Sequence, residues 1–270
     1  AQGQSEVVVG KALKTMKREA CFVATKVFFP MGEGPNDKGL SRKHVFEQCN
    51  ASLKRLGQDY VDLYQCHRFD PETPMEELVR TMDDLTRQGK ILYWGVSEWS
   101  GSQIEDAYRV AAELNAVPPI SNQPCYNMLT RNIEASVIPV CERLGVGQVV
   151  FSPLAQGVLT GKYAPGKPLP EGSRAADSRV NMFMMGRSLM SDETLMKVER
   201  LKAIAQDEGL TLGQMALAWC LRETNVASVI IGATKPQQIE ENVTAAGLKL
   251  SSEALAKIET ILATPVGARA

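Results

Sequence analysis

Short apolar runs alternate with longer amphipathic runs along this chain of 270 residues, and this alternation limits the possible folds more than any other feature. The short runs are mostly apolar, are rich in β-branched or aromatic residues and are bounded by polar residues, Gly or Pro. Such runs are typical of strands that are buried on both faces of a parallel sheet. The six predicted strands are Cys21–Val27, Val61–His67, Ile91–Ser97, Ile120–Pro124, Gly147–Ser152 and Ser228–Gly232.

Apolar residues at three- and four-residue spacing predict helices in the longer runs. The segment Ser41–Leu56 begins with a serine suited to the N-cap position and carries Val45, Cys49 and Leu53 on one face. The chain also begins within a helix-like run, Glu6–Leu13. The other predicted helices are Pro74–Gln88, Ser102–Leu114, Asn132–Leu144, Ser191–Glu208, Leu212–Arg222, Pro236–Ala246 and Ser252–Leu262.

Strands that alternate with helices predict right-handed βαβ units and a parallel sheet. No Gly-x-Gly-x-x-Gly follows the first strand, which argues against a doubly wound dinucleotide-binding sheet. A (β/α)8 barrel is favoured, and such a barrel needs eight strands. We therefore expect a single barrel domain over residues 1–270 whose N-terminal one or two βα units are absent from the numbered chain.

Charge and composition exclude several functional classes. The 30 Lys and Arg residues balance 31 Asp and Glu residues, so the basic excess of a nucleic-acid-binding protein is missing. No run approaches the roughly 18 apolar residues of a membrane span, and no signal peptide is visible. The six cysteines form no C-x-x-C pair, which favours free thiols in a reducing compartment and a cytoplasmic location. With two histidines in the chain, no metal site is expected.

Polar groups stand at the carboxyl ends of the predicted strands. In a barrel these ends meet at one mouth, where active sites lie. The long irregular segment from Ala155 to about Leu189 follows one of these strands and is typical of a lid or binding loop. Taken singly, each polar group has an ordinary structural explanation, and their shared location is what suggests function. They are Lys26, His67, Ser97, Glu98, Asn122, Gln123, Ser152, Gly232 and Thr234.

Several segments, in their order and spacing, resemble the aldo-keto reductase family, and most of all its branch that contains the β subunits of voltage-gated potassium channels and their bacterial relatives. The resemblance covers residue 1 to about residue 262. The segments are Ala24–Phe28 (ATKVF), Arg55–Glu77 (RLGQDYVDLYQCHRFDPETPMEE), Gly89–Ser100 (GKILYWGVSEWS), Ser121–Leu129 (SNQPCYNML), Phe151–Tyr163 (FSPLAQGVLTGKY) and Ile230–Asn242 (IIGATKPQQIEEN).

The resemblance implies NADPH-dependent reduction of aldehydes or ketones by a tetrad of Asp, Tyr, Lys and His. By position, Lys26 resembles the tetrad Lys and His67 the tetrad His. The Asp and the Tyr are expected upstream of Ala1. An ammonium beside a Tyr lowers its pKa from about 10, which makes the phenol a better proton donor. His67 would bind and orient the substrate carbonyl.

The resemblance also implies cofactor contacts, and it favours NADP(H) over NAD(H). Ser97, Glu98 and Gln123 match the positions that hold the nicotinamide carboxamide, although the family usually has Asn or Arg in place of Glu98. Phe151 would stack on the nicotinamide. Ser152, Leu154, Gln156 and Gly157 match positions that meet the pyrophosphate, and Lys162 and Arg174 of the long loop could pair with its oxygens. Thr234, Lys235 and Gln238 match the pocket for the 2′-phosphate, and Glu241 and Asn242 match residues that meet adenine. Gly232, at a strand end, is a further expected cofactor contact. Phe28, Phe29 and Trp99 would line a substrate pocket suited to carbonyl compounds of little charge.

Three functional interpretations remain open at this point. The first is a reductase acting on a small carbonyl substrate. The second is a cofactor-sensing regulatory β subunit of a potassium channel with slow or no turnover, and the retained His67 argues for the first over the second. The third is an inactive fragment. Assembly into a homo-oligomer or with a channel partner is undetermined by the sequence, as is the physiological substrate.

Overall fold

A computed structural model of the chain describes residues 2–181, 184 and 189–263. The chain separates into two compact units. Unit 1 comprises Ala1–Pro124 and Glu134–Gln148, and unit 2 comprises Cys125–Ile133 and Val149–Ala270.

The strands form a sheet whose spatial order, β1-β2-β3-β4-β5-β6, is the order along the chain. Each recorded pairing from β1 to β5 is parallel. The predicted α/β class and parallel sheet are therefore confirmed. The strands are β1 (Ala24–Val27), β2 (Val61–Cys66), β3 (Ile91–Val96), β4 (Ser121–Asn122), β5 (Gly147–Phe151) and β6 (Val226–Ile230).

Two predicted strands were three residues too long. The first strand begins at Ala24 rather than Cys21, because a short 3-10 helix, η1 (Arg18–Ala20), precedes it and the Cys21 N–H donates to Arg18. The fourth strand keeps only two residues, since Pro124 has no N–H with which to continue the ladder.

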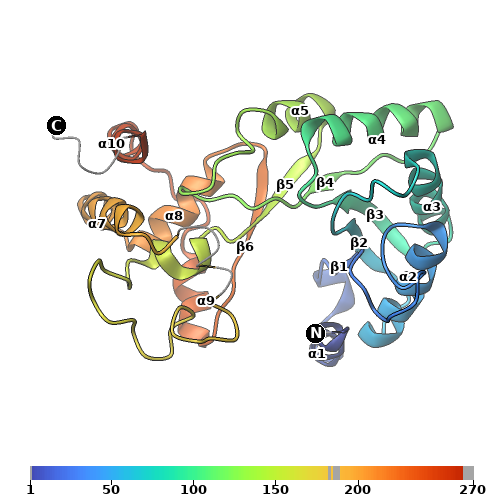
Figure 1. Cartoon of the computed structure of the whole chain (residues 1–270), viewed down its shortest axis with the longest axis horizontal. Helices are drawn as coiled ribbons and strands as arrows, with labels where there is room; N and C mark the ends of the chain where they lie inside the picture. The colour runs from blue at the N-terminus through green and yellow to red at the C-terminus, as the bar shows by residue number, and fades with distance from the viewer. Residues whose placement is uncertain (1, 182–183, 185–188, 264–270) are drawn as a thin grey trace. The chain divides into compact units, whose positions relative to one another are not determined.

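Helices α2, α3 and α4 lie along one face of the strands of unit 1 (Figure 1). Ser41 caps α2, and Ser100 and Gln103 form a capping box at α4. The helices of this unit are α1 (Gln4–Leu13), α2 (Arg42–Leu56), α3 (Met75–Arg87), α4 (Gly101–Leu114) and α5 (Val137–Leu144).

The predicted start of α5 at Asn132 was wrong, because the helix begins at Val137. Pro139 explains the difference. A proline is tolerated in the first turn of a helix, but farther inside it removes a hydrogen bond and clashes with the carbonyl four residues earlier. The residues before Val137 therefore form turns.

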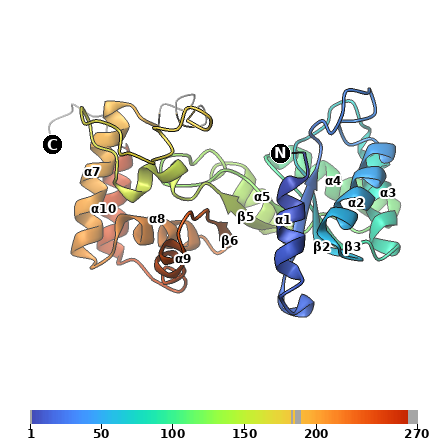
Figure 2. The ribbon, with the colours of Figure 1, turned by 90° about the horizontal axis from the view of Figure 1, so that it is seen from below.

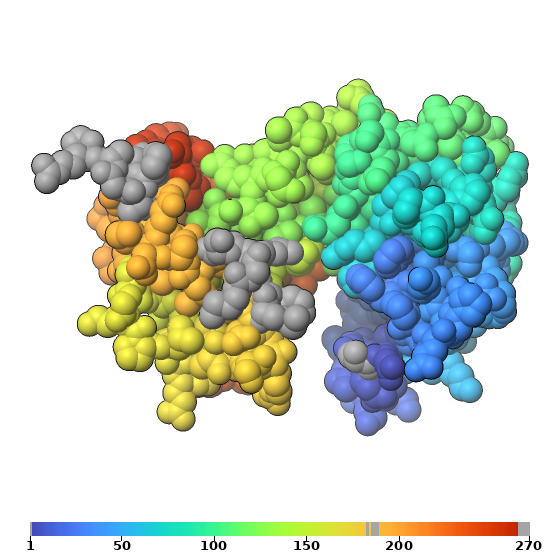
Figure 3. Space-filling model, viewed as in Figure 1, coloured from blue at the N-terminus to red at the C-terminus, as the bar shows by residue number. Residues whose placement is uncertain are grey.

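Helix α1 packs closely on the end of α2. A Cβ atom at Gly10 would lie 2.6 Å from the Leu56 carbonyl oxygen, so this approach requires glycine. The Glu6 carboxylate accepts hydrogen bonds of 2.5 Å from Thr25 and from Arg55. The outer side of α1 lies at the molecular surface (Figure 3), where Val8 and Val9 are exposed.

Unit 2 contains η2 (Ala155–Thr160), α7 (Asp192–Asp207), α8 (Leu212–Leu221), α9 (Pro236–Val243) and α10 (Ser252–Ala263). Helices α7 and α10 lie side by side (Figure 2). The start of the predicted irregular segment from Ala155 is ordered as η2.

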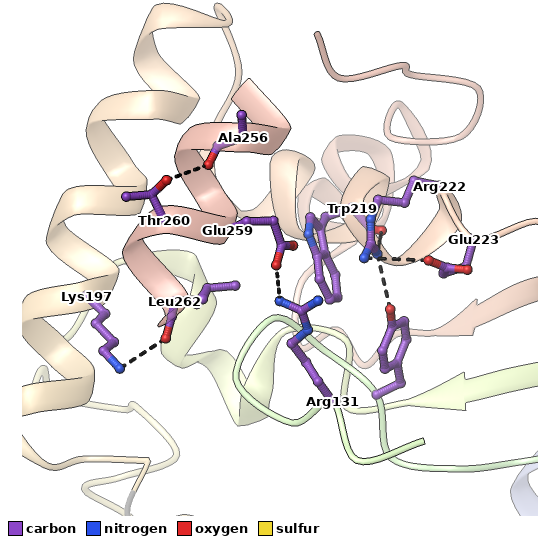
Figure 4. Close-up of polar contacts among 10 residues, drawn as sticks. Arg131, Lys197, Trp219, Arg222, Glu223, Ala256, Glu259, Thr260 and Leu262 are labelled. Carbon is purple, nitrogen blue, oxygen red and sulfur yellow. Dashed lines mark hydrogen bonds and ion pairs between the residues drawn. The ribbon is translucent and has the colours of Figure 1, made fainter. Parts of the chain in front are cut away.

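Polar and cation–π contacts join the helices of unit 2 around the buried Trp219 (Figure 4). Arg131 pairs with Glu259 of α10 at 2.6 Å, and the Lys197 ammonium of α7 donates to the Leu262 carbonyl at 3.3 Å. The Arg222 guanidinium lies 3.7 Å from the Trp219 ring centroid. These contacts give unit 2 an interior of its own.

No helix in the described part of the chain has both the length and the apolar character needed to cross a membrane.

Candidate active site

The carboxyl ends of the first four strands bring several predicted site residues to one edge of the sheet in unit 1. Lys26 of β1 is in register with Gln65 of β2, and His67 directly follows β2. The His67 N–H donates to the Val27 carbonyl at 2.9 Å, and the Gln123 N–H donates to the Val96 carbonyl at 2.8 Å. These backbone bonds continue the parallel pairing past the strands, so Lys26, His67, Ser97 and Gln123 share this edge.

The Lys26 ammonium acts electrostatically on the His67 imidazole. Burial lowers the pKa of His67 to about 4, and the charges of Lys26 and Arg68 add to this effect. Burial and the Arg68 charge also lower the pKa of Lys26. His67 is therefore neutral at pH 7, so its imidazole has one hydrogen-bond donor and one acceptor.

We expect the low pKa of His67 to make stability depend on pH. An unfolded His takes up a proton near pH 6.5, whereas folded His67 does so only near pH 4. Between these values the unfolded state binds more protons, so stability falls as the pH drops from about 6.5 to about 4. The loss is on the order of 1 kcal/mol after allowance for solvent screening. Urea unfolding at several pH values should show a smaller loss for His67→Gln than for the wild type, and an equal loss would contradict the assignment.

Of the three predicted pocket aromatics, Phe29 contacts His67 and Phe28 packs against Phe29. The Phe29 ring packs edge to face on the His67 imidazole and on the Phe28 ring, with distances between ring centroids of 4.7 Å and 5.3 Å. Phe29 is 48% exposed. Trp99 is 2% exposed and packs edge to face on Phe69 at 5.1 Å. Phe29 thus provides an apolar surface next to His67 and Phe28 extends it, whereas Trp99 lies in the packed interior.

Gln65 is a buried site residue that the sequence analysis missed. Its Oε1 accepts from Gln123 Nε2 at 3.2 Å, which leaves the Gln123 carbonyl oxygen as an acceptor. The Ser97 hydroxyl donates to the Gln123 main-chain carbonyl at 2.8 Å. Gln65 Nε2 is itself buried without a partner among the described residues. The available signal was an amide inside the apolar run VDLYQC, two residues before His67.

Asp70 is a second residue that sequence reasoning missed. Its buried carboxylate accepts from the Leu40 N–H at 2.7 Å, the Glu72 N–H at 3.0 Å and the Thr73 hydroxyl at 2.9 Å. The loop that begins at Phe28 is closed by a 2.7 Å bond from the Gly39 N–H to the Phe28 carbonyl. Asp70 therefore ties this loop, with Phe28 and Phe29, to the segment that follows His67.

In unit 2, the residues after β5 form one connected group. The Ser152 carbonyl accepts from Asn127 Nδ2 at 3.0 Å, and the Ser152 hydroxyl accepts from Gln156 Nε2 at 2.5 Å. Arg174 donates to the Gln156 side-chain carbonyl. A Cβ atom at Gly157, where φ is +98°, would lie 3.1 Å from the Lys162 ammonium. The structure thus brings Ser152, Gln156, Gly157, Lys162 and Arg174 together. Phe151 is the last residue of β5, and the Leu154 main-chain carbonyl accepts a hydrogen bond of 2.8 Å from the Gly157 N–H.

The predicted residues near α9 form a second group in unit 2. Gln238 Oε1 accepts from the Thr234 N–H at 2.8 Å and from the Lys235 N–H at 3.3 Å. Lys235 is the N-cap residue of α9, and Glu241 and Asn242 lie on this exposed helix. Gly232 follows β6 by two residues.

In unit 1, Glu98 adopts a left-handed backbone conformation with φ of +58° directly after Ser97.

Comparison with known proteins gives a family match over nearly the whole chain. A family model described as "Aldo/keto reductase family" matches residues 1–263. A rice protein (Oryza sativa subsp. japonica) named "Probable voltage-gated potassium channel subunit beta" is 47% identical over 268 residues, which cover 97% of this chain and 80% of the rice protein. An Arabidopsis thaliana protein of the same name is 46% identical over 268 residues, with the same coverage of both chains.

Proposed function

The chain belongs to the aldo/keto reductase family, and from this premise we propose that it reduces aldehydes or ketones to alcohols with NADPH, with Lys26 and His67 as two catalytic residues. The observation that carries the proposal is the placement of Lys26 and His67 at the ends of adjacent parallel strands, where the ammonium charge acts on the imidazole. The sheet, whose recorded pairings from β1 to β5 are parallel, supports a (β/α)8 barrel as the fold of the single domain to which residues 1–270 belong.

Within each unit taken by itself, several residues fit one part of NADP(H). The Gln123 carbonyl oxygen, left as an acceptor by Gln65, fits the carboxamide NH2 of the nicotinamide. Lys162 and Arg174 lie beside Gly157 and Gln156 and supply positive charge suited to a pyrophosphate. Lys235 at the N-terminus of α9 fits the 2′-phosphate that distinguishes NADP from NAD. When bound, the reduced nicotinamide supplies a hydride to the substrate carbon.

Lys26 and His67 prepare the site for charge that develops on the carbonyl oxygen. Neutral His67 can donate a hydrogen bond to this oxygen and orient the carbonyl. The Lys26 ammonium would favour the ionised form of a Tyr beside it, the proton donor of the family's tetrad, and so lower the pKa of that phenol. Phe28 and Phe29 provide apolar contact to the rest of the substrate.

Steady-state oxidation of NADPH by the full-length protein, with 4-nitrobenzaldehyde as substrate, tests the proposal. We expect turnover with NADPH and a weaker response to NADH. An absence of NADPH oxidation with a series of activated aldehydes would overturn it. All six cysteines are free thiols, which agrees with a reducing, cytoplasmic site of action.

A second candidate function is that of a channel β subunit, which the names of the relatives at 46% and 47% identity favour. Its test is co-purification of the full-length protein with the pore-forming subunit of a voltage-gated potassium channel. A stable complex that survives Lys26→Met would support a regulatory role separate from turnover. A protein that never binds the channel subunit would remove this candidate.

A further inference from the structure

Arg68 places a guanidinium beside the proposed active site. It directly follows His67 and is half-buried. Its Nη1 donates to the His67 carbonyl oxygen at 2.5 Å, and the guanidinium carbon lies 5.8 Å from the Phe29 ring centroid. Since Phe29 also contacts the His67 imidazole, the guanidinium and the imidazole share one aromatic neighbour.

Among the described residues, Arg68 forms no ion pair with a carboxylate. Two other half-buried arginines of unit 1 do form one, since Arg18 pairs with Asp62 at 2.6 Å and Arg55 with Glu6 at 2.5 Å. The charge of Arg68 lowers the pKa of both Lys26 and His67, so it acts on both proposed catalytic groups. Lys26 and Arg68 thus place two cationic groups near His67, and the Phe29 ring lies beside the guanidinium.

We propose that Arg68 binds the carboxylate of the substrate, so that the site selects aldehydes or ketones that carry a carboxylate group. This inference rests on the proposed reductase function and names its substrate class. A guanidinium has five N–H donors, and one backbone bond leaves enough of them to hold a carboxylate through two parallel bonds. Phe29 would contact the apolar part of such a substrate while His67 meets its carbonyl. The charge of Arg68 thus changes the expectation of a substrate with little charge.

Two matched aldehydes test this inference on the full-length protein. They are 4-carboxybenzaldehyde and its neutral methyl ester, methyl 4-formylbenzoate. For Arg68→Gln we expect kcat/KM for the carboxylate to fall by roughly 10- to 100-fold, because a charge-assisted bond is lost. For the ester the change should stay below about threefold, which shows that the variant is folded and catalytically intact. For Arg68→Lys, kcat/KM for the carboxylate should lie between the values of the wild type and of Arg68→Gln, since lysine keeps the charge but lacks the planar set of donors for two parallel bonds.

Arg109→Gln is the matched control, because Arg109 is an exposed residue of α4 paired with Asp106 and Glu113. It should leave the ratio of the two kcat/KM values unchanged. Equal losses for acid and ester in Arg68→Gln would overturn the inference while the reductase function stands.

Calorimetric binding of 4-carboxybenzaldehyde in the presence of NADP+ separates the two proposals. If neither aldehyde turns over, the reductase proposal fails. Weaker binding to Arg68→Gln than to the wild type would then still support the carboxylate site. Equal binding to both proteins would overturn it.

Discussion

Lys26→Met is expected to lower kcat for aldehyde reduction by about 10²- to 10⁴-fold, the range for loss of general acid–base catalysis. Methionine has a similar length and fills the same space, but it removes the ammonium that activates the proton donor. Lys26 is half-buried and has a lowered pKa, so its charge is held there at a cost in folding free energy. The variant should therefore be at least as stable as the wild type while it loses activity.

Measurements of kcat, of the Kd for NADPH and of the thermal midpoint on the same preparation test this prediction. Lys43→Met is the control, because Lys43 is an exposed residue of α2 that pairs with Glu47, and it should leave all three values unchanged. If Lys26→Met retained wild-type kcat, Lys26 would not be catalytic. A weakened Kd for NADPH with unchanged kcat would instead assign it to cofactor binding.

The elements of the fold could be predicted from the sequence because their signals are local. The apolar runs around Val61 and Ile91 are long enough to specify strands, and the pairing of β1 to β5 follows from the βαβ pattern. Two of the errors arose where one proline decides a boundary. Pro139 delays α5 and Pro124 ends β4, and both effects depend on which hydrogen bonds the neighbouring backbone makes.

The site could be predicted only in part. Lys26 and His67 stand out because polar groups that end buried strands are visible in the sequence. Gln65, Arg68 and Asp70 lie within a few residues of His67, yet the contacts that give two of them a role are distant along the chain. Gln65 meets Gln123, 58 residues away, and Asp70 holds Leu40, 30 residues away. Such partners follow from the three-dimensional arrangement of loops, which local patterns do not encode.

The loop that carries Phe28 and Phe29 depends on Asp70, so Asp70→Ala should have a large effect on stability. The substitution removes the acceptor of the Leu40 N–H, which is fully buried, and of the Thr73 hydroxyl. The loss of hydrogen bonds to a charged group and the burial of an unsatisfied N–H each cost up to a few kcal/mol. We therefore expect the free energy of unfolding to fall by about 3 kcal/mol. Urea unfolding followed by circular dichroism measures this loss.

Asp70→Asn and Asp59→Ala give the comparison that assigns the effect to the loop. Asparagine keeps one oxygen acceptor, so its loss should be smaller than that of alanine. Asp59 is exposed, and its replacement should change the free energy of unfolding by no more than about 0.5 kcal/mol. Asp70 fixes the loop without touching Lys26 or His67. Whichever of the two Asp70 variants still folds should therefore show a larger increase in KM for aromatic aldehydes than decrease in kcat. Equal stability of Asp70→Ala and the wild type would mean that the loop is anchored by other contacts, such as the bond between Gly39 and Phe28.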